Sequence, residues 1–262
     1  MSAPILVTGG TGTLGSQVVP LLRGAGQEVR VLTRHAREPE PGIEYVACNL
    51  LGGQGIEAAL EGVEVVLHLA GGAKGDDVAT RNLATAAAKA GVRHLVYISV
   101  VAADKLPIGY FKAKLGAALA VAESGVPWTT LRAAQFHEFV LTAVSTMAKL
   151  PVVPVPGGLR FQPVDSRDVA ERLVELALGA PQGRVPDLVG PKVYALGDLS
   201  REHLRATGKR RPKLPVRIPG KAGRAYRAAE NLTLEGALVA GRSWEDFLAE
   251  RAAEAAGATK AA

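Results

Sequence analysis

The chain has 262 residues, 48% of them hydrophobic, which is enough for one large α/β domain or a core domain with a small appended lobe. Its net charge of +6 is concentrated between residues 184 and 227, without the aromatic interleaving, zinc-ligand spacing or helix-turn-helix pattern of nucleic-acid-binding proteins. No apolar stretch reaches membrane-spanning length and the one cysteine, Cys48, allows no internal disulfide, so we expect a cytoplasmic protein that binds neither nucleic acid nor membrane.

Strand-like and helix-like segments alternate from the start of the chain. Apolar runs predict strands at 4–8, 28–33, 43–47, 64–69, 93–99 and 127–131. Amphipathic patterns predict helices at 14–23, 54–61, 76–90 and 110–124. This alternation is typical of a parallel sheet with helices on both faces, so we expect a doubly wound α/β fold of the Rossmann type.

A glycine cluster follows the first predicted strand and opens the first predicted helix. Gly9 can adopt backbone angles forbidden to other residues, Gly12 lets the chain approach a ligand, and Gly15 lets helix and strand pack tightly. The free N–H groups of the first helical turn carry partial positive charge, which suits a pyrophosphate. A purely structural turn could use the same glycines, but the strand-turn-helix context favours a dinucleotide site. Its expected residues are Thr8, Gly9, Gly10, Thr11, Gly12, Thr13, Leu14 and Gly15.

Arg34 follows the second predicted strand, where dinucleotide-binding folds place the group that faces the adenosine ribose. An acidic residue there accepts a hydrogen bond from the 2′-hydroxyl of NAD, whereas an arginine suits the 2′-phosphate of NADP. The sequence therefore favours NADP(H) over NAD(H), unless Arg34 is an exposed side chain with no ligand. His68, in an apolar strand, is expected to be a core imidazole. Further cofactor contacts are expected at Asn49, Leu50, Leu69, Ala70 and Gly71.

Three residues suited to acid–base chemistry follow in order. Ser99 ends the fifth predicted strand, and Tyr110 and Lys114 are four residues apart, so they share one face of a helix. A nearby ammonium and an oxidised nicotinamide lower the pKa of a phenol, and a serine hydroxyl can orient a carbonyl group. We expect Tyr110 as proton donor, Lys114 as ribose ligand and Ser99 as substrate-orienting residue. The alternative is a packing role for Tyr110, with Lys114 binding the ribose only.

After about residue 133 the alternation becomes irregular. The pattern predicts a strand at 160–164 and a helix at 166–178, for which Asp165 or Ser166 could be the cap. Segments at 185–189, 199–206, 221–229 and 244–255 are expected to form a small mixed lobe. We therefore expect one nucleotide-binding domain over 1–262, in which 133–262 contributes a lobe that covers the substrate.

With the glycine cluster, Arg34, Ser99 and the Tyr110/Lys114 pair, together with the stretches 125–132 and 161–170, the chain resembles an atypical short-chain dehydrogenase/reductase of the NmrA-like or NAD(P)H-binding type. The resemblance covers roughly residues 4–180. It implies a Rossmann-type fold with NADP(H) bound across it, the Ser/Tyr/Lys active site, and substrate contacts near Gln135 and Phe136. Two departures stand out: Ala133 replaces the proline that often follows the family's arginine, and the interval from Ser99 to Tyr110 is slightly short.

The expected function is NADP(H)-dependent oxidation or reduction of a small carbonyl, quinone or secondary-metabolite substrate, with no metal site. A second hypothesis is a redox-sensing module that reports the NADPH/NADP⁺ ratio to a protein partner through its basic segment, 184–227. A third is a nucleotide-sugar epimerase or dehydratase, against which Arg34 argues because that chemistry usually recycles NAD. Direct binding to DNA ranks last.

Overall fold

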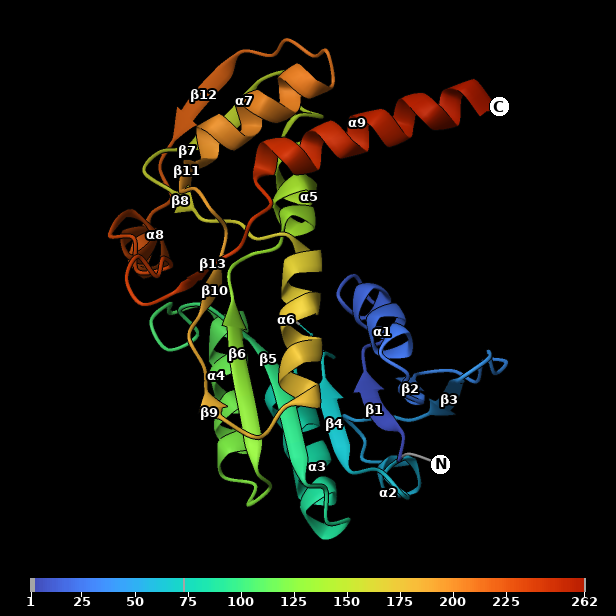
Figure 1. Cartoon of the computed structure of the whole chain (residues 1–262). Coiled ribbons are helices and arrows are strands. Elements are labelled where there is room, and N and C mark those ends of the chain that lie inside the picture. Colours follow the sequence, from blue (N-terminus) through green and yellow to red (C-terminus); the bar gives the residue numbers. More distant parts are fainter. Residues whose placement is uncertain (1–2, 73, 262) are drawn as a thin grey trace.

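The structure, a computed structural model, describes residues 3–72 and 74–261. Its centre is a parallel sheet whose main strands are β1 (Ile5–Thr8), β2 (Val29–Thr33), β3 (Ile43–Ala47), β4 (Val65–His68), β5 (His94–Val100) and β6 (Trp128–Ala133). Within the described residues the sheet has nine strands in the order β13-β10-β6-β5-β4-β1-β2-β3, with β9 also beside β6 (Figure 1). The order reverses direction at β1, as in doubly wound folds, and the predicted fold class is confirmed.

Helices cover both faces of this sheet. One face packs against α1 (Gly15–Gly24) and α6 (Ser166–Leu178), and the other against α3 (Asp76–Lys89) and α4 (Gly109–Ala122), with the short α2 (Ile56–Ala59) beside α3. Residues of β5 alternate between the two cores: Val96 and Ile98 belong to the first, and Leu95 and Tyr97 to the second. Because both of their faces are buried, β1, β4 and β5 are mostly apolar, which made them recognisable in the sequence.

The C-terminal segments divide between the sheet and a lobe above its carboxyl edge (Figure 1). The sheet gains β9 (Gly183–Arg184), β10 (Leu188–Val189) and β13 (Leu238–Val239). The expectation that 185–189 belongs to the lobe is therefore wrong, because β10 pairs with β6. The lobe comprises α5 (His137–Met147), α7 (Leu196–Ala206), α8 (Gly220–Arg227), α9 (Trp244–Ala261) and two small sheets formed by β7 (Val153–Pro156) with β12 (Lys213–Val216) and β8 (Arg160–Phe161) with β11 (Tyr194–Ala195).

The strand predicted at 160–164 is shorter than expected. Only β8 is a regular strand, and it pairs antiparallel with β11. Pro163 has no N–H to continue the ladder, and the Val164 N–H donates instead to the Gln135 carbonyl at 3.0 Å. The helix predicted at 166–178 is confirmed as α6, and Asp165 is its cap.

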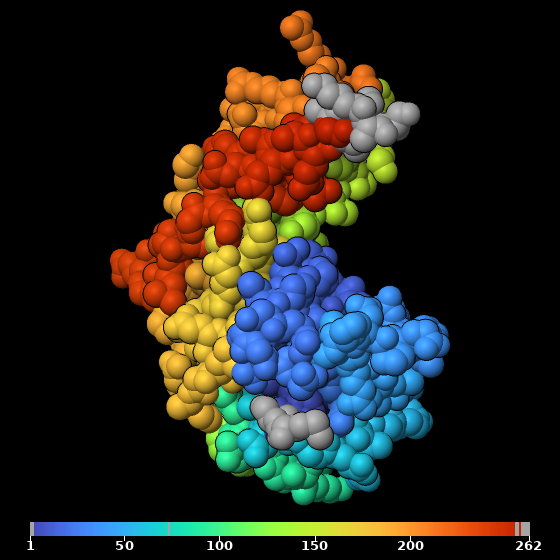
Figure 2. All heavy atoms as spheres, turned by 45° about the vertical axis from the view of Figure 1, so that its right-hand side comes forward, coloured from blue at the N-terminus to red at the C-terminus, as the bar shows by residue number. Residues whose placement is uncertain are grey.

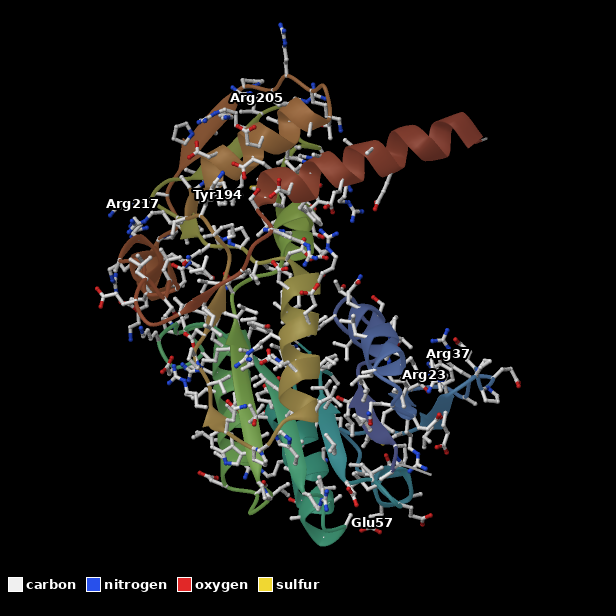
Figure 3. The ribbon with its side chains drawn as sticks, viewed as in Figure 1. Arg23, Arg37, Glu57, Tyr194, Arg205 and Arg217 are labelled. Atoms are coloured by element: carbon white, nitrogen blue, oxygen red, sulfur yellow. The ribbon has the colours of Figure 1, made fainter. Side chains whose placement is uncertain are left out.

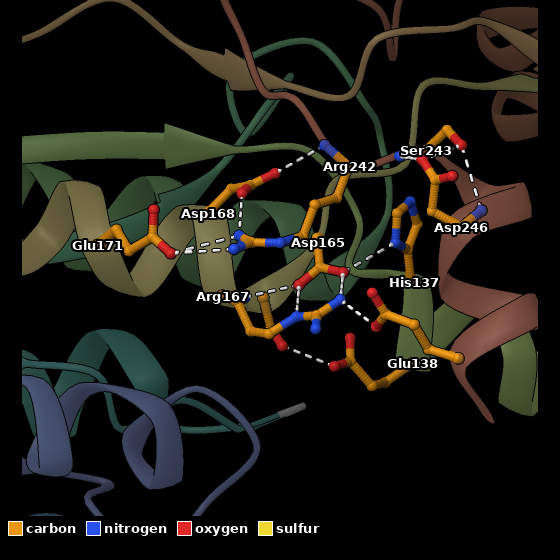
Figure 4. A network of polar contacts seen from close by, with 11 residues as sticks. His137, Glu138, Asp165, Arg167, Asp168, Glu171, Arg242, Ser243 and Asp246 are labelled. Atoms are coloured by element: carbon orange, nitrogen blue, oxygen red, sulfur yellow. Dashed lines mark hydrogen bonds and ion pairs between the residues drawn. The ribbon is translucent and has the colours of Figure 1, made fainter. Parts of the chain in front are cut away.

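Ion pairs join the start of α6 to the segment that enters α9 (Figure 4). The Asp165 carboxylate accepts hydrogen bonds from Arg167 Nε at 2.9 Å and Nη2 at 2.8 Å. Arg167 also contacts Glu250 of α9 at 2.6 Å. Beside them Arg242 donates to Asp168 through both its backbone N–H and its guanidinium. These contacts fix the lobe to a helix of the sheet layer.

Asp165→Asn should destabilise the protein by about 3 kcal/mol at pH 7, because a buried charge network loses one member. Burial alone would raise the pKa of Asp165, but hydrogen bonds from Arg167 and His137 hold it well below its usual range. A carboxylate with a depressed pKa stabilises the fold above its unfolded-state pKa, near 3.9, and that stabilisation is lost as the pH falls towards the folded-state value. The difference between variant and wild type should therefore shrink below about pH 4.

Urea denaturation at pH 7, 5 and 3.5 measures this effect. Asp198→Asn is the matched control, since Asp198 forms an exposed pair with Arg201 within α7. It should change the unfolding free energy by less than about 0.5 kcal/mol at any pH. An equal loss for Asp165→Asn at pH 7 and pH 3.5 would contradict the electrostatic explanation.

Candidate functional site

The glycine cluster forms a tight turn between β1 and α1. Gly9 has a φ of +68°, the conformation that favours glycine, and a Cβ there would lie 2.8 Å from the Ala70 backbone nitrogen. A Cβ at Gly15 would lie 2.2 Å from the Gly9 carbonyl oxygen, so α1 packs directly on the turn. At Gly12 a Cβ would meet only that same oxygen, at 3.3 Å. The conformation expected at Gly9 and the close packing expected at Gly15 are both present, and Gly12 lies on the open side.

The backbone that leads into α1 is open to solvent, since residues 11–13 are exposed. Among the described residues no side chain caps this helix, and Leu14 at its N-cap has no side-chain acceptor. The turn is closed by its own backbone: the Gly12 N–H donates to the Gly9 carbonyl at 3.0 Å, and the Ser16 N–H to the Gly12 carbonyl at 2.9 Å. An uncapped helix start beside exposed backbone suits an anion such as a pyrophosphate. The turn therefore fits a dinucleotide.

Thr8 and His68 tie β1 to β4 beneath this turn. Thr8 is fully buried, and its hydroxyl lies 2.6 Å from His68 Nδ1 while accepting the N–H groups of Leu69 and Ala70 at 3.1 and 3.0 Å. His68 Nε2 lies 2.8 Å from the Thr80 hydroxyl. Burial, and then the charge of Lys114, lower the pKa of His68 to about 3. His68 is thus the neutral core imidazole that the sequence predicted, and Thr8 places the 69–71 segment next to the glycine turn.

Arg34 lies just past β2, which pairs with β1. Its side chain is exposed and has no ion pair or hydrogen bond with the described part of the chain. Nearby, the Arg37 guanidinium stacks on the Tyr45 ring at 5.2 Å. Arg34 is therefore a cation available to a ligand phosphate. It follows β2, the strand next to β1, and the glycine turn follows β1.

The loop after β3 contains the two residues expected near the adenine. Asn49 Oδ1 accepts the Gly52 N–H at 3.0 Å and so shapes the loop. The Leu50 carbonyl accepts a hydrogen bond at 2.9 Å from Asn82 of α3, a residue that the sequence analysis missed. Asn49 is exposed and Leu50 half-buried, so both remain candidates for a cofactor contact.

Lys114 is paired with another residue that the sequence analysis missed. Its Nζ lies 3.1 Å from Asp76 Oδ2, and the two side chains are only 7% and 3% exposed. The Tyr97 hydroxyl donates to the same oxygen at 3.5 Å. A Cβ at Gly71 would lie 2.6 Å from Lys114 Nζ, so the ammonium lies against the end of β4. In the sequence Asp76 stands out only as an acidic residue at the start of the predicted helix 76–90. Asp77 fits the same description, so the sequence could not tell which of the two would pair with Lys114.

Tyr110 lies at the start of α4, where its side chain is 39% exposed and meets the Phe111 ring edge-on at 5.3 Å. Burial, and then Asp76, raise the pKa of Tyr110. The sequence predicted that Lys114 would lower this pKa. Burial is the larger cause of the opposite shift, and the carboxylate of Asp76, which pairs with the ammonium, adds to it.

Ser99 is buried at the end of β5, and its hydroxyl forms no hydrogen bond of normal geometry with the described residues. It approaches the Tyr97 hydroxyl on the same face of the strand. No hydrogen bond joins Ser99, Tyr110 and Lys114 to one another within residues 3–72 and 74–261. The structure thus brings the three to one corner of the sheet without direct contact between them.

Gln135 and Phe136 follow β6, where the chain crosses from the sheet into the lobe. The Gln135 side-chain nitrogen is buried without a partner among the described residues, and Phe136 is half-buried against the core. A buried amide donor of this kind is one that a bound ligand can satisfy. Arg132, which precedes the Ala133 departure, is buried and pairs with Asp104 at 3.1 Å.

The carboxyl ends of the strands point toward the lobe, and Figure 2 shows a recess between the lobe, with α9 in red, and the N-terminal layer, with α1 in blue. Ligands of open parallel sheets bind at this edge. Only the first residues of the basic segment reach the sheet, through β9 and β10, whereas Arg205 and Arg217 are on the outer side of the lobe (Figure 3). Among the helices described, none has the length and apolar character to cross a membrane.

Comparison with known proteins gives consistent results. Residues 9–178 match the NAD(P)H-binding family. The chain is 33% identical over 215 residues to a (4-alkanoyl-5-oxo-2,5-dihydrofuran-3-yl)methyl phosphate reductase of Streptomyces griseus, covering 78% of this chain and 74% of that protein. It is 26% identical over 230 residues to photosystem II assembly factor Ycf39 of Trieres chinensis, covering 81% and 72%. The Escherichia coli NADPH-dependent quinone oxidoreductase QOR2, solved with NADPH, shares the fold with a TM-score of 0.77 at 19% identity, over 94% of this chain and 99% of that chain.

Proposed function

Because this chain belongs to the NAD(P)H-binding family, we propose that it is an NADP(H)-dependent oxidoreductase that reduces a small carbonyl, quinone or secondary-metabolite substrate. The observation that carries the proposal is the pairing of two anion sites on neighbouring strands. The uncapped start of α1 would hold the pyrophosphate, and the unpartnered Arg34 would hold the 2′-phosphate. The relative from Streptomyces is itself named a reductase, which supports the reaction class.

The chain's own residues would divide the work at the carboxyl edge of the sheet. The cofactor supplies the hydride when bound. Tyr110 would hold the proton that a reduced carbonyl oxygen needs, and Lys114 would bind the nicotinamide ribose. Ser99, Gln135 and Phe136 would orient the substrate, and the lobe contributed by 133–262 would exclude water. The cofactor would also contact Gly9, Gly10, Thr11, Gly12, Thr13, Leu14, Gly15, Asn49, Leu50, Leu69, Ala70 and Gly71, whereas Thr8 is fully buried and would only position this segment.

Calorimetric titration with NADPH, NADH and their oxidised forms tests the binding step, and NADPH consumption with a panel of aldehydes, ketones and quinones tests the reaction. We expect NADPH to bind more tightly than NADH. Absence of NADPH binding to the wild-type protein would contradict the proposal.

Arg34→Ala should weaken NADPH binding by about 10- to 100-fold, because a hydrogen bond to a charged group contributes about 1.5–3 kcal/mol. NADH lacks the 2′-phosphate, so its dissociation constant should stay within about twofold of wild type. The matched control is Arg37→Ala, which removes a nearby exposed cation that stacks on Tyr45. Equal losses for NADPH and NADH, or for both variants, would show that Arg34 does not read the 2′-phosphate.

A second candidate is a redox-sensing module without turnover. It is favoured by the separation of Ser99, Tyr110 and Lys114, and by the relative named as an assembly factor. In that case NADPH and NADP⁺ would bind with different affinities, no substrate of the panel would consume NADPH, and a protein partner would engage the basic surface of the lobe. Pull-downs with each redox form, run beside the substrate panel, separate the two functions.

A further inference from the structure

The proposed function gives Lys114 a role but does not explain why its charge is buried beside Asp76. Two charges taken out of water destabilise a protein unless they are well paired and hydrogen-bonded. Here the 3.1 Å contact, with both side chains more than nine-tenths buried, supplies the pairing. It connects the first residue of α3 to the middle of α4. A purely structural contact between these helices could have used apolar side chains, so the retained charges call for a role.

The surroundings of the pair hold it in one arrangement. Tyr97 lies beneath it, with its hydroxyl 3.5 Å from Asp76 Oδ2 and its ring centre 5.3 Å from Lys114 Nζ. The positive end of the α3 dipole favours a carboxylate at Asp76. On the remaining side, the ammonium lies near the backbone of Gly71, which is exposed in the segment that follows β4. The ammonium is thus fixed where a cofactor ribose would pass.

We propose that Asp76 is a positioning residue, which holds the Lys114 ammonium against Gly71 for the ribose and places a carboxylate one turn of α4 away from Tyr110. This inference rests on the proposed function for the ribose contact. An ammonium has three N–H donors, so one can bind Asp76 while the others remain for ribose hydroxyls.

The second consequence concerns the charge around Tyr110. The titratable groups at this corner are His68 from β4, Asp76 from α3, Tyr97 from β5, and Lys114 from α4 itself. His68 is neutral above its pKa of about 3, and Tyr97 has a raised pKa because of its burial and the charge of Asp76. Burial and Asp76 also raise the pKa of Tyr110. The phenol therefore stays protonated at neutral pH and acts as a proton donor, as carbonyl reduction requires.

The first experiment needs no cofactor. Phenol ionisation is followed at 295 nm in the wild type and in Asp76→Asn, each with and without Tyr110→Phe, so that the difference isolates Tyr110. We expect the Tyr110 midpoint to fall by at least about half a pH unit in Asp76→Asn, toward the ordinary value near 10. Asp77→Asn, at the next position of α3, is the control and should leave the midpoint unchanged.

The second experiment measures NADPH affinity by calorimetry. Asp76→Asn should weaken binding by about tenfold, Asp76→Glu should restore part of it, and Asp77→Asn should stay within about twofold of wild type. If Asp76→Asn does not fold, Asp76→Asn/Lys114→Met removes both buried charges together, and its Tyr110 midpoint should be lower than that of Lys114→Met alone.

The two measurements separate this inference from the proposed function. If the wild type binds no NADPH, the proposed function fails, and the titration alone decides whether Asp76 sets the charge at Tyr110. If the wild type binds NADPH, either an unchanged Tyr110 midpoint or an affinity loss no larger in Asp76→Asn than in Asp77→Asn overturns the assignment of Asp76.

Discussion

Tyr110→Phe should lower the rate of NADPH-dependent reduction by about 10²- to 10⁴-fold, the usual contribution of a positioned general acid. The variant keeps the ring that meets Phe111 edge-on and loses only the hydroxyl. Because Tyr110 is not part of the glycine turn and Arg34 remains in place, the dissociation constant for NADPH should stay within about threefold of wild type. Steady-state kinetics with the best substrate of the panel, combined with calorimetry, separate these two effects.

The pH dependence of the wild type adds a second check on Tyr110. Since burial and Asp76 raise its pKa, the phenol stays protonated through neutral and mildly alkaline pH. Reduction should therefore not decline with pH below about 10 through loss of this proton. Tyr45→Phe is the control, because the Tyr45 hydroxyl bonds Glu40 at the far edge of the sheet. Turnover of Tyr110→Phe equal to that of Tyr45→Phe would remove Tyr110 from the mechanism.

Much of the fold could be predicted because local and tertiary requirements agree in the first 180 residues. A strand buried on both faces is apolar at most positions, so β1 and β5 were visible from composition alone. In the lobe, the local sequence pattern does not indicate the tertiary position of each segment. The two-residue strand β10 is too short to show a hydrophobic pattern. It is placed beside β6 by the pairing of Leu188 with Ala133, which is 55 residues away in the sequence. Such non-local pairing cannot be read from spacing.

Some residues of the candidate site could likewise be predicted from the sequence, and others could not. Gly9 and Gly15 were predictable because a backbone conformation and a close contact each demand glycine. The pairing of Lys114 with Asp76 was not, because it depends on how α3 and α4 pack against each other. Sequence spacing placed Lys114 and Tyr110 on one face of α4. It could not show that burial would raise the pKa of the phenol, or that a carboxylate from another helix would pair with the ammonium.

Gly15→Ala should reduce NADPH binding on the order of 100-fold and destabilise the fold by about 2–3 kcal/mol. The added Cβ would lie 2.2 Å from the Gly9 carbonyl oxygen and 2.4 Å from Gly10 Cα. Both atoms belong to the backbone, so no flexible side chain can move aside. The start of α1 must shift away from β1, and its N–H groups then no longer converge on the position that a pyrophosphate would occupy.

Gly24→Ala, at the other end of the same helix, is the matched control, since a Cβ there would meet no atom of the described residues within 4 Å. Alanine favours a helix over glycine by up to about 1 kcal/mol, so this variant should be as stable as wild type or slightly more stable, with NADPH affinity unchanged. Urea denaturation and calorimetry of both variants test the contrast. If Gly15→Ala binds NADPH as tightly as Gly24→Ala does, the start of α1 does not hold the pyrophosphate, and the anion site must lie elsewhere on the sheet edge.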